Sequence, residues 1–189
     1  TLQLNNAQRG TYPAVRRNLA RWLDCSTLDE PDVRMFKARL ATELDSTDVF
    51  RWRNDESTIA ASISNAPVEW EDHQAWFAAA LASDKRWIFI VFRTESESQK
   101  VGMCRFDVAS GGTSAEVSIN LNPDYRGQRL ARAVLTTAIE AFRRATSPTV
   151  RLTATIRRAN LASEKVFRYA GFTTTSSDHE FARYSDGSG

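Results

Sequence analysis

The sequence is poor in the residues that build disulfide or metal scaffolds, with two cysteines among 189 residues. Cys25 and Cys104 have no metal-like spacing and can form at most one disulfide, which fits two idle thiols in a reducing cytoplasm. No apolar run approaches the length of a membrane span, and there is no charged-then-apolar secretory start. We therefore expect a cytoplasmic protein that uses no metal and has no membrane partner.

Several catalytic signatures are missing as well. The sequence has no Ser–His–Asp set, no zinc-binding spacing, no second phosphate loop and no internal repeat. Its net charge of +2 does not point to nucleic acid, but ten basic and only two acidic residues lie between Arg126 and Arg168. One polyanionic ligand docking on one edge would explain this asymmetry, and so would nucleic acid.

The most informative segment is the loop Tyr125–Ala131, with the sequence YRGQRLA. Residues 115–121 alternate apolar and polar side chains as a strand does, and Leu130 to Phe142 repeat apolar side chains as an amphipathic helix does. The first amides of a helix lack internal acceptors and its dipole is positive there, so an Arg-rich loop with a Gly at this place is suited to bind phosphate. The alternative is an ordinary turn with solvated arginines.

The rest of the chain alternates helices and strands. Asp45 to Thr47 can cap a helix, the polar residues 95–100 predict a turn, and Gly111-Gly112 predicts a hairpin. Hairpins followed by strand–helix–strand predict an α/β fold with a mixed sheet and helices on both faces. In chain order we expect helices around 15–23, 48–52, 69–82, 130–142 and 161–170, and strands over 33–41, 87–92, 101–108, 115–121, 150–157, 172–175 and 180–184.

Two motifs carry a resemblance to a known family. Ile119 to Ala131, including the loop above, resembles the acetyl-CoA pyrophosphate loop of the GNAT superfamily of N-acetyltransferases. Asn160 to Phe172 resembles that family's next motif: Asn, a small residue three on, an aromatic seven on, then Gly-Phe. Either motif alone is weak, but both in this order form a strong signal. The resemblance covers roughly residues 33–184.

The resemblance implies a GNAT fold, in which two central parallel strands, here 115–121 and 150–157, splay apart. The chain would then contain an N-acetyltransferase domain over 31–184 and a flexible tail over 185–189. Residues 1–30 would be a helical extension or linker, a cap or a dimer element. If they are a dimer element, the protein would be a homodimer.

The cofactor site also follows from the resemblance. Acetyl-CoA would lie in the splay as co-substrate, held by backbone groups near Ile119 and Leu121 on one side and by Asn160 and Ser163 on the other. The pyrophosphate would lie on the amides of Arg126, Gly127, Gln128, Arg129, Leu130 and Ala131.

Two positions depart from the family pattern. Arg129 stands where Gly is usual because the backbone must approach phosphate closely; we expect a helical Arg there, whose guanidinium could add a phosphate contact. Phe167, beside the cofactor, replaces the Tyr that protonates the departing thiolate in many members. Proton donation would then fall to water or to another group.

The reaction needs a base, because the attacking amine must lose a proton. Glu116 is our candidate, since it is a carboxylate on the strand that would carry the acetyl group. Its alternative role is a strand-edge carboxylate paired with Arg105 or Arg151. His73 is a second candidate base, but it shares a helix face with Trp70 and Phe77, where packing or a substrate hydrogen bond is more usual.

The acceptor side carries a further resemblance. Trp52, Arg53 and Asn54, together with His73, resemble the substrate-binding residues of GNAT enzymes that acetylate nucleotide-linked amino sugars, as in the pseudaminic-acid pathway. Trp52 offers a stacking face, Arg53 a fork for a second pyrophosphate, and Asn54 two-way hydrogen bonds. Alternatively, Trp52 is core and the other two are solvated.

The sequence thus predicts an acetyl-CoA-dependent N-acetyltransferase whose acceptor is a small-molecule amine, with a nucleotide-linked amino sugar as the first choice. Protein N-termini or other small amines are the alternative acceptors. A non-catalytic acyl-CoA-binding module is the rival class, for which Phe167 is the main support. A nucleic-acid binder comes third, because few aromatics lie among the arginines.

Overall fold

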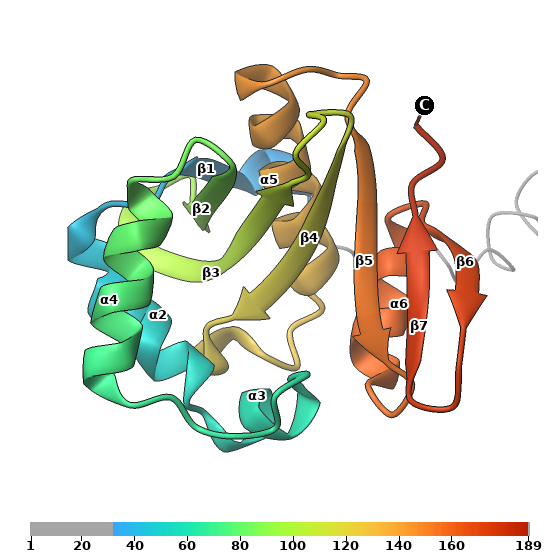
Figure 1. Ribbon diagram of the computed structural model, residues 1–189. Coiled ribbons are helices and arrows are strands. Elements are labelled where there is room, and N and C mark those ends of the chain that lie inside the picture. The colour runs from blue at the N-terminus through green and yellow to red at the C-terminus, as the bar shows by residue number, and fades with distance from the viewer. Residues whose placement is uncertain (1–31, 189) are drawn as a thin grey trace, which may run out of the picture. The chain divides into compact units, whose positions relative to one another are not determined.

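The structure, a computed structural model, describes residues 32–188, so the helix expected around 15–23 lies outside the described residues. One sheet of seven strands runs through the described part in the order β1-β2-β3-β4-β5-β7-β6 (Figure 1). Its neighbouring strands are antiparallel except β4 and β5, which are parallel. The strands are β1 Phe36–Leu40, β2 Arg86–Arg93, β3 Ser96–Val108, β4 Ser114–Leu121, β5 Arg151–Arg157, β6 Thr173–Ser177 and β7 Phe181–Ser185.

Helices cover both faces of this sheet, which confirms the predicted fold class. On one face lie α5 (Ala131–Ala145) and α6 (Leu161–Tyr169), and on the other α2 (Ser46–Arg53) and α4 (Trp70–Leu81) (Figure 1). A short helix, α3 (Glu56–Ala61), follows α2. Short 3-10 turns occupy Val33–Met35, Glu43–Asp45 and Pro123–Tyr125.

Alternating side chains of the strands build two cores. In β2, Phe89 and Val91 belong to the core under α5, whereas Ile88 and Ile90 belong to the core under α2 and α4. This is the period-two pattern of a strand that is covered on both faces. In the first core, the ring of Phe106 stacks on that of Phe142 of α5, with centroids 4.2 Å apart.

Some boundaries differ from the expectations. β3 begins at Ser96 instead of at residue 101, because its polar first residues continue the ladder with the end of β2. These residues are exposed on a hairpin, so they do not need to alternate with apolar residues. The helix α3 was not expected at all, and no residue of it is buried. At the C-terminus, Ser185 belongs to β7, and the Asp186 carboxylate accepts a 3.1 Å hydrogen bond from the Leu152 amide. The structure therefore holds 185–186 against β5, where a flexible tail was expected.

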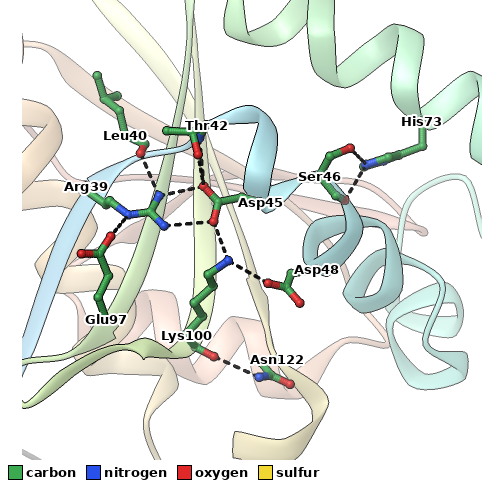
Figure 2. Close-up of polar contacts among 10 residues, drawn as sticks. All are labelled: Arg39, Leu40, Thr42, Asp45, Ser46, Asp48, His73, Glu97, Lys100 and Asn122. Carbon is green, nitrogen blue, oxygen red and sulfur yellow. Dashed lines mark hydrogen bonds and ion pairs between the residues drawn. The ribbon is translucent and has the colours of Figure 1, made fainter.

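Asp45 precedes α2 but does not cap it as expected, since its side chain makes no hydrogen bond to that helix. Its carboxylate has no exposed surface and accepts hydrogen bonds from Arg39 at 2.7 and 3.0 Å and from the Thr42 amide at 2.9 Å (Figure 2). The Lys100 ammonium, 2.7 Å from Asp45, also reaches Asp48 at 2.8 Å. This cluster ties β1 and β3 to the start of α2.

Candidate active site

The two parallel strands separate in the middle of the sheet. β4 and β5 pair only from Ser114 with Arg151 to Glu116 with Thr153, and beyond Glu116 they diverge (Figure 1). The separated parts are 117–121 of β4 and 154–157 of β5. The splay predicted between these strands is therefore present, and Glu116 is the last residue of β4 before it.

The loop after β4 has a backbone suited to an anion. Gly127 and Arg129 have positive φ angles of 74° and 57°, and Leu130 follows with φ −78° and ψ −17°. Successive left- and right-handed residues turn their amides toward one concavity, which binds anions. Among residues 32–188, no hydrogen bond uses the amides of Gly127, Gln128 or Arg129. They lie immediately before the N-terminus of the fifteen-residue helix α5, where the dipole is positive.

Arg129 itself differs from the expectation. It is not helical: α5 begins at Ala131, and the φ of 57° places Arg129 in the left-handed region that glycine adopts without cost. A non-glycine residue there costs about 1–2 kcal/mol. The family's usual Gly at this position thus has a local reason, and this chain keeps the same backbone with an Arg.

The other predicted cofactor residues flank the splay. Ile119 and Leu121 of β4 are partly buried against the α5 core. Across from them, the Asn160 carboxamide oxygen caps α6 by accepting from the Ser163 amide at 3.0 Å. Phe167 is 2% exposed and packs edge-on against Phe172, so it belongs to the core.

The guanidinium of Arg126 binds the start of α3. It donates to the Asp55 carboxylate, to the Ser57 hydroxyl and, at 2.6 Å, to the Thr58 hydroxyl, all at the start of α3. Hydrogen bonds from the Arg126 guanidinium and the Ser57 hydroxyl lower the pKa of the Asp55 carboxyl to about 2. The Arg126 side chain is therefore engaged with the start of α3, and the pyrophosphate role predicted for this residue concerns its backbone.

Glu116 lies on the face of β4 opposite to the α5 core, where its side chain is exposed. Its side chain makes no hydrogen bond or ion pair with any residue in 32–188, so the alternative pairing with Arg105 or Arg151 does not occur. In the sheet register it stands between Asp107 and Thr153. Asp107 pairs with Arg86 at 2.5 Å and with Arg105 at 2.8 Å.

The face of the sheet that carries Glu116 also carries arginines. Arg183 of β7 is in register with Thr155 and lies on this same face, because its neighbours Ala182 and Tyr184 belong to the α5 core. No ion pair of Arg183 occurs within residues 32–188. Arg105 extends over the ring of Trp76, 5.8 Å from its centroid. Glu116 and Arg183 are thus exposed on the same face of the sheet, with β5 between their strands.

The predicted acceptor residues Trp52, Arg53 and Asn54 have structural contacts instead. Trp52 has no exposed surface and lies in the α2–α4 core. Arg53 donates to the Ser64 hydroxyl at 2.7 Å and the Ala66 carbonyl at 3.0 Å. Asn54 pairs in both directions with the backbone of Val68, at 2.7 and 2.8 Å. These side chains fix the segment that leaves α2, and none of them reaches the splay.

His73 likewise lies in packing. It is 2% exposed, and its Nε2 is 2.9 Å from the Ser46 carbonyl and 3.2 Å from the Ser46 hydroxyl (Figure 2). Its ring stacks between Trp70 and Phe77. Burial lowers its pKa and outweighs the opposing hydrogen bond to the Ser46 backbone. This is the packing alternative considered for His73.

Sequence reasoning missed α3 and the position of Arg183 on the same face as Glu116, whereas it considered Arg105. Arg183 had a usable signal, because it alternates with apolar residues of its strand. The helix α3 had none, since none of its residues is buried in a core. In the described part of the chain, no cluster of three His, Cys, Asp or Glu could hold a metal, and no helix is long and apolar enough to cross a bilayer.

These features define a class: an α/β domain with a splayed parallel strand pair and an amide loop for an anion beside it. A profile described as the acetyltransferase (GNAT) domain matches residues 37–173, and the chain belongs to this family of acetyltransferases. A search of curated proteins found no match.

Solved structures share the fold. The spermidine N-acetyltransferase from Vibrio cholerae in complex with CoA and spermine superposes with a TM-score of 0.69 and 13% identity, covering 80% of this chain and 94% of that one. An aminoglycoside acetyltransferase in complex with coenzyme A gives 0.65 and 18%, covering 79% and 92%. The ribosomal L7/L12 alpha-N-protein acetyltransferase in complex with CoA gives 0.66 and 14%, covering 80% and 93%.

Proposed function

We propose that this chain transfers the acetyl group of acetyl-CoA to a primary amine that carries an anionic group, with Glu116 as the general base. The observation that carries the proposal is the joint position of the splay, the free amide loop and Glu116. The loop lies at one end of the separated strands and Glu116 at the other. A cytoplasmic location fits this chemistry.

The residues present fit acetyl-CoA. The amides of Gly127 to Arg129 have no protein acceptor within 32–188 and are preorganised for a diphosphate. Backbone groups of 117–120 have no partner on β5 and are available to the amide-containing arm, whereas the Leu121 carbonyl accepts a 3.4 Å hydrogen bond from Arg126. When bound, acetyl-CoA supplies an activated thioester carbonyl next to β4.

Glu116 would take the proton from the acceptor ammonium, directly or through one water. An exposed carboxylate without an ion pair is free for this task, whereas Asp107 is held between two arginines. Phe167 has no hydroxyl, so the thiolate would receive its proton from water that reaches the open face. Phe167 was the main support for a non-catalytic acyl-CoA-binding module. Its ring is buried against Phe172 and forms part of the core, so a packing role accounts for it.

The charge around Glu116 bears on the acceptor. Arg183 would repel a polyamine and attract an amine that carries a carboxylate or phosphate, whereas the charge of Arg105 is compensated by Asp107. This supports a nucleotide-linked amino sugar, with the cation for its diphosphate on β7 instead of at Arg53. A peptide N-terminus with acidic neighbours is the second candidate, and the same arginine favours it.

The first test is direct binding. Acetyl-CoA at 100-fold over its dissociation constant should raise the free energy of unfolding by roughly 2.7 kcal/mol. A thermal melt with and without millimolar acetyl-CoA measures this. An unmoved melting curve would remove the proposed function, and a larger shift with duplex DNA would favour a nucleic-acid binder.

The acceptor test uses Arg183→Ala. Loss of a charge-assisted hydrogen bond is worth about 1.5–3 kcal/mol, so the KM for a nucleotide-linked amino sugar should rise by roughly tenfold or more, with the KM for acetyl-CoA unchanged. Arg144→Ala, on the exposed surface of α5, is the matched control. Following CoA release across a panel of amines tests the choice: a preference for spermidine over every anionic amine would contradict it.

A further inference from the structure

The helix α3 lies across the end of the splay and touches both strands. Its first residues contact the β4 side: Asp55, Ser57 and Thr58 bind Arg126, and the Thr58 hydroxyl lies 3.3 Å from the Asn120 carboxamide oxygen. Figure 1 shows α3 below the diverging ends of β4 and β5.

The other end of α3 contacts the β5 side. Asn160 donates to the Ala61 carbonyl at 3.5 Å, and Arg157, the last residue of β5, donates to the Ser62 carbonyl at 3.5 Å. These contacts are long, whereas those of Arg126 are short and charged. The helix thus bridges the two strands at the point where they have no hydrogen bonds to each other.

Polar contacts dominate this bridge. No residue of α3 is fully buried, and its apolar residues Ile59 and Ala61 are only partly buried, so little apolar burial opposes its detachment. Segments with few buried contacts open locally at low free energy, on microsecond to millisecond times. The strongest single contact is the ion pair of Asp55 with Arg126, whose two side chains are 28% and 29% exposed.

We propose that Asp55 is a positioning residue that, through Arg126, holds α3 as a gate over the cofactor splay. Acetyl-CoA enters and leaves when α3 detaches from the β4 side. The inference rests on the proposed function, since it needs a cofactor in the splay. Arg126 suits this role because it directly precedes the amide loop and belongs to the same segment that receives the diphosphate.

Asp55→Asn tests the gate with little damage to the helix. Asp55 also caps α3 by accepting from the Ser57 and Thr58 amides, and Asn caps equally well. The substitution therefore removes the charge toward Arg126 and keeps the cap. Asp32→Asn is the matched control, because Asp32 likewise caps a helical turn and pairs with an arginine, Arg34, but precedes the edge strand β1.

Stopped-flow binding of CoA measures both rate constants. If α3 gates exchange equally in the free and bound protein, Asp55→Asn raises the association and dissociation rates together, by roughly two- to fivefold, and leaves Kd within a factor of two. Hydrogen exchange in the free protein should show weaker protection of residues 55–62, and Asp32→Asn should match the parent in both measurements.

Two results would overturn the gate while leaving the proposed function intact. In the first, CoA binds the parent and Asp55→Asn with the same two rates. In the second, only dissociation accelerates and Kd weakens, so that α3 contributes to affinity and not to exchange. A parent that binds no CoA would instead remove the proposed function and the gate together.

Discussion

Glu116→Gln should lower kcat by about 10²–10⁴-fold, with little change in the affinity for CoA. Gln keeps the size of the side chain and its polar contacts with solvent but cannot accept a proton. The parent carboxylate has no ion pair within residues 32–188, so its replacement leaves no stranded partner and should hardly alter stability. Steady-state kinetics by CoA release, together with CoA titration, separate the two effects.

The matched control for Glu116 is Glu140→Gln, an exposed carboxylate of α5 whose nearest ion pair, with Arg144, is a loose 3.9 Å. It should behave as the parent. Activity of Glu116→Gln within a few-fold of the parent would return Glu116 to a structural role. In that case His73→Gln tests the second candidate base. We expect this variant to be less stable, because it loses the packed ring, and to keep the pH–rate profile of the parent.

Asp45→Asn should destabilise the fold by about 3 kcal/mol, because it removes the central carboxylate from a buried ion cluster. Arg39 would lose the partner that accepts two of its hydrogen bonds and Lys100 its nearest partner, although Glu97 and Asp48 remain to them (Figure 2). Because those partners remain, we expect the loss in the free energy of unfolding to lie at the lower end of the range for broken buried ion pairs. Urea unfolding at neutral pH measures it, and Glu97→Gln, whose side chain is 59% exposed, should cost less than about 1 kcal/mol.

The same variant has a pH signature. Burial by itself would raise the pKa of Asp45, but hydrogen bonds from Arg39 and Lys100 outweigh it and hold the pKa well below its ordinary value. A carboxylate with a depressed pKa stabilises the fold above its unfolded pKa of about 4, and the contribution is lost as the pH falls toward its folded value. The stability gap between parent and Asp45→Asn should therefore narrow below pH 4. An equal gap at pH 3 and pH 7 would contradict the charge-based explanation.

Strand and helix patterns were readable where one face of an element meets a core. Residues 115–121 and 150–157 alternate because Ala115, Val117, Leu152 and Ala154 all turn to α5. The polar residues 96–100 form a strand without an apolar face, and their pattern was interpreted as a turn. Such a segment is ordered by its ladder with β2, which a local pattern cannot indicate.

The sequence by itself determined the family, the order of most elements and the amide loop, because these depend on local periodicity and on contiguous motifs. Only the tertiary structure decided what the charged side chains do. Arg126 turns to α3 and Arg53 to the loop after it. The Glu116 side chain has no partner among residues 32–188. A guanidinium pairs with whichever carboxylate or carbonyl the fold brings within about 3 Å, and Asp55 lies 71 positions from Arg126 along the chain. The sequence alone does not show that these two side chains lie next to each other in the fold.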